Sequence, residues 1–341
     1  MDKSENHVRL TSAEIAALWT AYMNACMSKC MLSFMIKHIV DEEIYPAVEQ
    51  TLKVSKTQVE QLIEIFKEEN FAIPIGFGDD DVDVNAPSLY TDTFCLTYIN
   101  HMGRAGMIAN SGFISMSARK DIRSFFTKAL NDTSKIYNET TDIALNKGVF
   151  VRAPYISVPS EPDYIDSKGY LSGFHLFNKQ RPVNAVEISH LYMNTQTNLI
   201  GTKLCLSFAQ TSPTKEVQQF MLRGNEISKK HMKVFTSALL DNNIQSPISS
   251  DVCVTDSIVP PFSDKLMMFH MGLLSAAGTG NYATAAAASQ RTDLVVDYER
   301  LSIEIGQYAK EGADIMIKNQ WLEQPPGTVD KEKLATKKRV K

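Results

Sequence analysis

The chain has 341 residues, a formal net charge of −4 and a pI near 6.0, and 44% of its residues are hydrophobic. These values are typical of a soluble globular protein and exclude the strongly positive field of a nucleic-acid-binding chain. No apolar run reaches the roughly 18 residues that a membrane-spanning helix needs. The length allows two domains of ordinary size, each with a full core.

The cysteines and the opening residues indicate a compartment. The five cysteines are scattered and odd in number, and the first residues are polar, without the apolar segment of a signal peptide. We therefore expect free thiols in a reducing, cytoplasmic environment.

Apolar residues at helical spacing predict four long helices in the first part of the chain. The first begins after a cap at Thr11 or Ser12, and the third begins at the hydroxyl and carboxylate pair Thr91–Asp92. A connector rich in Gly, Asp and Pro separates the second helix from the third. The expected helices cover, to within a few residues, 12–37, 41–70, 92–115 and 118–146.

The same pattern returns in the second part of the chain. Glu14 matches Glu187 and Asn70 matches Asn243 when the two parts are compared without a gap. A repeat of this length is too long for a solenoid unit, so it indicates two domains of one fold. The second set of helices is expected near 185–211, 213–243, 264–289 and 292–319.

Eight long helices, with one long connector in each set of four, predict an all-α protein made of two tandem ferritin-like four-helix bundles related by internal duplication. A plain up-and-down bundle is the competing topology. We expect the inter-domain segment to pack across the bundles and the basic tail to be disordered. The expected units are a polar leader (1–10), the first bundle (11–148), a Pro- and aromatic-rich inter-domain segment (149–183), the second bundle (184–322) and the tail (323–341).

Several runs in the second half carry a family resemblance. They are Asn184–His190, Arg223–His231, Val254–Ser257, Pro260–His270 and Trp321–Pro326. In these runs, and along nearly its whole length, the chain resembles a domain-of-unknown-function family of spore-forming bacilli. The resemblance implies tandem ferritin-like bundles. Because some members are labelled as candidate spore-coat proteins, it also implies an association with spores, but it assigns no catalytic residues.

A metal site in the second bundle is one hypothesis. A di-iron bundle needs a Glu from each of two helices and a Glu-x-x-His from each of the other two. Glu187 and His190 form one such motif, and the hairpin geometry brings His231 to about the same level. The set is incomplete, because the fourth helix of this bundle has carboxylates but no second Glu-x-x-His, and the first copy has no Glu-x-x-His at all. No cofactor is expected; a metal, if bound, would be Fe, Mn or Zn. The alternative for Glu187 is helix capping, as for Glu14.

Two histidines recur with the same neighbours. His101-Met-Gly in the first copy matches His270-Met-Gly in the second. A shared position indicates either a shared site or a buried histidine that bonds to a neighbouring helix. The second interpretation is favoured, and the role of the pair is open.

Two further patterns suggest metals but have simpler explanations. A stripe of sulfur side chains on the first helix would suit copper(I), yet its counterparts in the second copy are mostly apolar, which favours core packing. Cys30 is matched by Lys203, which predicts an exposed position. The run Asp81-x-Asp83-x-Asn85 resembles the start of a calcium loop but lacks the required glycine. The stripe comprises Met23, Cys26, Met27, Cys30, Met31 and Met35.

Three functional hypotheses follow. The leading one is a non-catalytic structural or interaction protein of the spore-associated kind, with protein partners or self-association. The second is a metal-dependent oxidoreductase with a degenerate site in the second bundle. The third is a carrier of a small apolar ligand, because cores lined by Met, Ala and Gly can leave a cavity.

Overall fold

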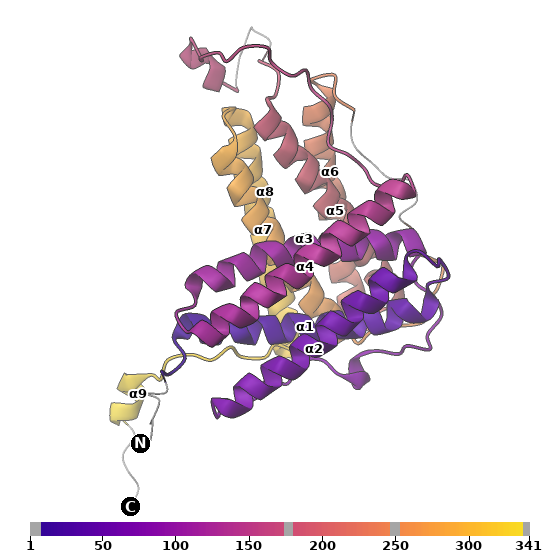
Figure 1. Cartoon of the computed structure of the whole chain (residues 1–341), viewed down its shortest axis with the longest axis vertical. Coiled ribbons are helices and arrows are strands. Elements are labelled where there is room, and N and C mark those ends of the chain that lie inside the picture. Colours follow the sequence, from indigo (N-terminus) through magenta and orange to yellow (C-terminus); the bar gives the residue numbers. More distant parts are fainter. Residues whose placement is uncertain (1–7, 174–179, 246–252, 337–341) are drawn as a thin grey trace, which may run out of the picture.

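A computed structural model describes residues 8–173, 180–245 and 253–336, and these parts of the chain are all-α. Their eight long helices form two four-helix bundles that cross each other (Figure 1). This confirms the fold expected from the sequence. The first bundle contains α1 (Ser12–His38), α2 (Tyr45–Glu68), α3 (Asp92–Met116) and α4 (Lys120–Asn146). The second contains α5 (Ala185–Thr211), α6 (Lys215–Leu240), α7 (Asp264–Ala288) and α8 (Thr292–Lys318).

Each bundle consists of two helical hairpins joined by a long connector. In the first bundle α1 packs on α2 and α3 packs on α4, and the second bundle repeats this with α5–α6 and α7–α8. One connector covers 69–91 and includes the 3-10 turn Asp79–Asp81; the other covers 241–263, of which 246–252 lie outside the described residues. A single long crossover between the second and third helices is a ferritin-like arrangement.

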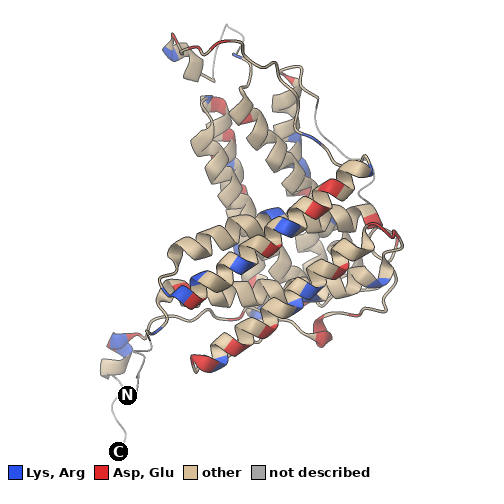
Figure 2. Ribbon diagram, in the orientation of Figure 1, with Lys and Arg blue, Asp and Glu red and all other residues tan. Residues whose placement is uncertain are grey.

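The helices divide into inner and outer ones by their charge. The sequences of α1, α3, α5 and α7 contain few charged residues, whereas α2, α4, α6 and α8 carry many along one face (Figure 2). A helix that is apolar on most sides must be covered on most sides. Accordingly the inner helices lie between the outer helices of their own bundle and the other bundle, and one apolar cluster continues through both repeats. Members of this cluster include Met27, Met31, Phe94, Phe208 and Met267.

The ends of the outer helices fix the register of the two repeats. The residues that follow α2 and α6, Asn70 and Asn243, both have a positive φ, near 52° and 59°. Gly148 after α4 and Gln320 after α8 have the same left-handed conformation. Such residues end helices by turning the chain back on the last carbonyl groups. Equivalent positions of α2 and α6 can therefore be counted from Asn70 and Asn243.

The two connectors pair with each other in a pattern that is nearly two-fold symmetric. Val82 forms an antiparallel bridge with Phe262, and Tyr90 forms one with Val254. Since Tyr90 and Phe262 both lie two residues before their helix, each bridge is the counterpart of the other. The backbone N–H of Thr255 donates to Leu89 at 3.0 Å. The repeats thus meet through matching surfaces, as the subunits of a two-fold dimer do.

Parts of the segment between the bundles differ from the expectation of close packing. Tyr155, Val158 and Tyr164 are 88%, 90% and 95% exposed, so the middle of the segment does not pack across the bundles. Figure 1 shows it passing over the end of the second bundle before α5. Within the described part of the segment, packing is found at the two ends, where Phe150 joins the core and Arg181 stacks over Tyr170 at 4.0 Å.

The tail also differs in part from the prediction of disorder. Glu323 accepts hydrogen bonds from the backbone N–H groups of Ile75 and Gly76 at 2.9 and 3.2 Å, which attaches the start of the tail to the first connector. A short helix, α9, covers Lys331–Thr336. Residues 337–341 and the first seven of the polar leader lie outside the described residues. Among the helices that are described, all are too short or too polar to cross a lipid bilayer.

Candidate functional site

The first bundle contains a cavity of about 210 Å³ that is lined by its four helices and, on one side, by Leu273, Leu274 and Ala277 of α7. Small residues of α1 and α3, among them Ala21, Ala25 and Ala109, form part of its wall. Two glycines bring α3 close to α4, because a Cβ atom on Gly106 would lie 2.6 Å from the methyl group of Thr133. The helices are thus held together on one side while short side chains leave space on the other.

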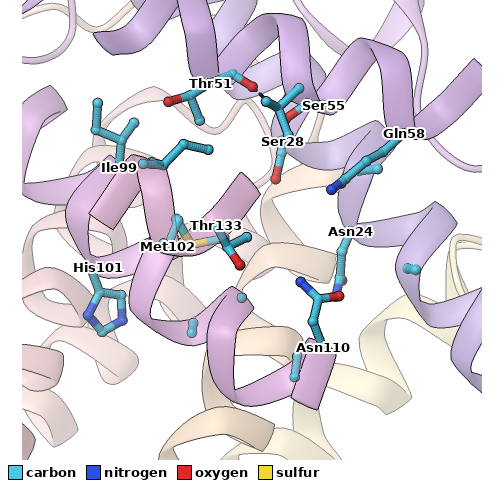
Figure 3. A pocket seen from close by; sticks show the side chains of 18 of the residues that line it. Asn24, Ser28, Thr51, Ser55, Gln58, Ile99, His101, Met102, Asn110 and Thr133 are labelled. Atoms are coloured by element: carbon cyan, nitrogen blue, oxygen red, sulfur yellow. Dashed lines mark hydrogen bonds between the residues drawn. The ribbon is translucent and has the colours of Figure 1, made fainter. Parts of the chain in front are cut away.

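Polar side chains of all four helices line this space, and four of them, from three helices, lie together. Asn24 and Ser28 come from α1, Gln58 from α2 and Asn110 from α3. Figure 3 shows them gathered on one side of the cavity, away from Ile99. The Oδ1 atom of Asn24 is buried and has no hydrogen-bond partner. A buried polar atom without a partner costs about 1–3 kcal/mol, so this arrangement favours a ligand or water that completes its hydrogen bonds.

The second bundle shows what the same positions look like when they are filled. Asn110 is the nineteenth residue of α3, and the nineteenth residue of α7 is Tyr282. Counted back from the matching residues after α2 and α6, the counterpart of Gln58 is His231. The Tyr282 hydroxyl lies 3.0 Å from Nδ1 of His231 and accepts from the Asn198 amide at 2.8 Å. The remaining space is about 50 Å³.

His231 is therefore part of a hydrogen-bonded chain. Its Nε2 atom lies 3.0 Å from Glu304 Oε2, and Glu304 also receives a hydrogen bond from Lys230. Burial lowers the pKa of His231, and the Glu304 carboxylate opposes that shift. Both ring nitrogens thus have protein partners, which leaves no lone pair for a metal in this arrangement.

Glu187 occupies a capping position and uses both carboxylate oxygens there. Its Oε2 atom accepts from the backbone N–H of Asn184 at 2.9 Å, and its Oε1 atom accepts from the N–H groups of Gln290 and Arg291 at 3.1 and 3.0 Å. The Arg181 guanidinium binds both oxygens, at 2.7 and 2.8 Å. The side chain is fully buried and joins the start of α5 to the start of α8.

Glu14 does the same in the first bundle. It accepts from Thr11 and from the backbone N–H groups of Ala118 and Arg119 at 2.9 and 2.7 Å. The shared glutamate is thus a structural connection between the first and fourth helices of each bundle. This agrees with the capping alternative in the sequence analysis.

The structure does not assemble the predicted metal set. His190 lies one turn beyond Glu187 on α5 and is partly exposed, while His231 is engaged with Glu304. Among the described residues, no three His, Cys, Asp or Glu side chains are placed to hold a metal ion.

His101 and His270 are both buried but do not hold equivalent places. His270 is the seventh residue of α7, and the seventh residue of α3 is Tyr98, one turn before His101. Nε2 of His270 lies 3.4 Å from the Tyr98 hydroxyl, so the two equivalent residues meet where the repeats cross. Nδ1 of His101 accepts from Arg104 at 2.8 Å. Burial lowers the pKa of each histidine to about 3, so both are neutral near pH 7.

The sulfur stripe and the aspartate run have structural roles. Five of the six stripe residues are buried in the core, as expected. The sixth, Cys30, is also buried, contrary to the prediction, because the connector covers it: its thiol donates to the carbonyl of Gly78 at 3.4 Å. Asp81 accepts from the hydroxyl of Ser263 at 2.6 Å and Asp83 from the backbone N–H of Asn85 at 2.9 Å. These carboxylates stabilise the paired connectors.

Reasoning from the sequence missed the cavity residues. The comparison without a gap that matches Asn70 with Asn243 also matches Gln58 with His231, but the match of Asn110 with Tyr282 depends on a register that only the helix ends fix. The detectable signal was a pair of amides at positions where the other repeat has two ring side chains.

Fold and site together define a tandem four-helix-bundle protein in which the cavity of the first bundle is larger than the corresponding space in the second. The family model described as "Protein of unknown function" (DUF3231) matches residues 1–161 and 172–334, one match for each bundle, and the chain belongs to this family. Among solved structures it is similar to a candidate spore coat protein from Bacillus halodurans. The sequence identity is 20%, and the aligned region covers 44% of this chain and 98% of that chain. The TM-score is 0.40. No curated protein matches the chain.

Proposed function

We propose that the protein binds a small neutral molecule in the core of its first bundle, the ligand having an apolar body and one hydrogen-bonding group. The observation that carries this proposal is the cavity of about 210 Å³ with the unpartnered Oδ1 atom of Asn24. An apolar cavity of roughly 150 Å³ can hold a benzene molecule, so the available space suits a ligand slightly larger than that.

The chemistry of the lining decides the class of ligand. No acidic or basic side chain lines the cavity, and His101 at its edge is neutral. An ion would therefore lose its hydration without a counter-charge. Amide and hydroxyl groups can both donate and accept hydrogen bonds, so they suit an alcohol or an amide.

Three probes of the same shape test this proposal. Calorimetric titration with benzyl alcohol, toluene and benzylamine should give the tightest binding for benzyl alcohol, because only it combines neutrality with a hydroxyl group for Asn24 and Asn110. Equal binding of all three, or none of any, would contradict the proposal. A variant of the exposed residue Glu226, Glu226→Ala, serves as the matched control and should bind like the wild type.

Copying the second bundle into the first should close the cavity. The double substitution Asn110→Tyr and Gln58→His introduces the pair that fills bundle two, and Asp132 occupies the place of its Glu304 partner. We expect ligand binding to be lost and the free energy of unfolding to rise by about 1–3 kcal/mol, since filled space restores packing contacts. Urea unfolding of the ligand-free protein measures this. A destabilised variant that still binds benzyl alcohol would show that the ligand lies elsewhere.

A second candidate is a structural or interaction protein associated with spores, as the family resemblance implies. The exposed tyrosines of the inter-domain segment, Tyr155 and Tyr164, favour it, because large exposed apolar side chains are frequent at protein contacts. We expect a Tyr155→Ser and Tyr164→Ser variant to fold normally but to lose association with purified spore coat. Unchanged association of the variant, or no association of the wild type, would argue against this role.

A further inference from the structure

A second cavity lies between the two bundles and contains a cation without a counter-ion. It measures about 320 Å³ and is bounded by α3, α4, α5 and residues 149–153. It is distinct from the cavity inside the first bundle, although His101 lies at the edge of both. Most of its wall is apolar, with contributions from Leu96, Phe150, Leu199 and Ile200.

Arg104 is the basic residue of this cavity. The sequence of α3 contains only two charged side chains, Asp92 at its start and Arg104 in its middle. One terminal nitrogen of Arg104 donates to His101 at 2.8 Å and lies 3.5 Å from the Thr197 hydroxyl. Its Nε and Nη1 groups donate to no atom of the described residues, and no carboxylate there forms an ion pair with it.

The surroundings do not neutralise this charge. Burial lowers the pKa of Arg104, and the hydroxyl groups of Tyr137 and Tyr192 oppose the shift, but an arginine remains protonated in proteins. His101 is uncharged, and no acidic residue lines the cavity. Arg104 is partly buried, and a charge that is partly removed from water without a counter-ion is unfavourable for folding unless something else compensates for it.

The fold itself does not require an arginine here. Arg104 is the thirteenth residue of α3, and the thirteenth residue of α7 is Ala276. The equivalent inner helix of the second repeat, α7, therefore packs with only a methyl group at this position. A costly residue that the fold does not need is a sign of a binding role.

We propose that the inter-bundle cavity binds a small apolar monocarboxylate. The carboxylate would accept charge-assisted hydrogen bonds from the N–H groups of Arg104 that have no partner among the described residues. The hydrocarbon part would lie against Leu96, Phe150 and Ile200. The space is about twice that of a benzene-sized cavity, which suits a chain of the length of octanoate.

Titration of the full chain with octanoate, octanol and octylamine tests the proposal. In a buffer that contains chloride, octanoate should bind at least about tenfold more tightly than octanol, and octylamine should not bind, because charge-assisted pairing needs an anion. Equal binding of octanoate and octanol, or no binding of octanoate, would overturn the proposal. Binding in this buffer also shows a preference for the carboxylate over an inorganic anion.

Two variants connect the binding to the guanidinium. Arg104→Ala, which copies the second repeat, should lower octanoate affinity at least about tenfold and raise the melting temperature of the ligand-free protein, since it removes the unpaired charge. Arg300→Ala, on the outer helix α8, is the control and should leave affinity unchanged. Retained octanoate affinity in Arg104→Ala would overturn the assignment. The Asn110→Tyr and Gln58→His variant should still bind octanoate, so failure at one cavity is distinguishable from failure at the other.

Discussion

Acidification from about pH 7.5 to about pH 5 should remove roughly 4 kcal/mol from the free energy of unfolding. The buried histidines His101 and His270 have pKa values of about 3 in the folded protein, against about 6.5 in the unfolded chain. Between these values the unfolded chain binds protons that the folded protein does not. Stability therefore falls as the pH drops below about 6.5, by about 1.4 kcal/mol per pH unit for each histidine.

Urea unfolding across this pH range measures the effect. The double variant His101→Gln and His270→Gln keeps hydrogen-bonding groups for Arg104 and Tyr98, but the glutamines at these two positions do not titrate. Its stability should change much less with pH. A variant with the same pH dependence as the wild type would mean that other groups are responsible. The buried glutamates do not interfere, because their lowered pKa values keep their contribution to stability nearly constant above about pH 4.5, and that contribution is lost only as the pH falls below this value.

Removal of Glu187 should cost about 3–5 kcal/mol of stability, because three backbone N–H groups and the Arg181 guanidinium lose their acceptor at once. Burial raises the pKa of Glu187, but Arg181 and the backbone N–H groups of Asn184 and Arg291 lower the pKa by a larger amount. The net pKa is below the usual value, so the carboxylate is ionised in the folded protein. In Glu187→Ala the Arg181 charge, whose side chain is 14% exposed, is left without its partner.

A matched comparison separates the charge from the cap. Glu14→Ala removes the equivalent connection in the first bundle, where no arginine side chain binds the carboxylate, so its loss should be smaller, about 2–3 kcal/mol. Glu226→Ala on the surface of α6 should change stability by less than about 0.5 kcal/mol. Urea unfolding at neutral pH measures all three losses. If Glu187→Ala lowered the free energy of unfolding as little as Glu226→Ala does, the structural role of Glu187 would be contradicted.

The sequence alone predicted the helices, the duplication and the long crossovers. Helical spacing of apolar residues is a local property, and caps such as Thr11 and Thr91 act within one turn, so both can be recognised without a tertiary structure. The capping alternative for Glu187 was also available, because Glu14 has the same place in the other repeat. The inner position of α1 and α3 was detectable as well, since few of their residues are charged.

Other features depended on how distant parts of the chain meet. The recurrence of His101-Met-Gly and His270-Met-Gly suggested equivalence, but three matching residues carry less register information than the helix caps, which place Tyr98 opposite His270. Cys30 was expected to be exposed because nothing local shows that the connector covers it. The middle of the inter-domain segment was expected to pack because of its composition, yet Tyr155, Val158 and Tyr164 are exposed, and composition alone does not show which surface a segment meets.

The amino-acid pattern by itself determined an all-α chain folded as two related bundles, because periodicity and capping are short-range effects. Only the tertiary structure decided where a cavity remains and where a charge has no counter-ion. A cavity forms when side chains from several helices do not fill the volume between them. Asn110 leaves space in the first bundle, whereas the larger Tyr282 fills the equivalent position in the second. The unpaired charge of Arg104 likewise depends on which carboxylates are absent from its surroundings in three dimensions.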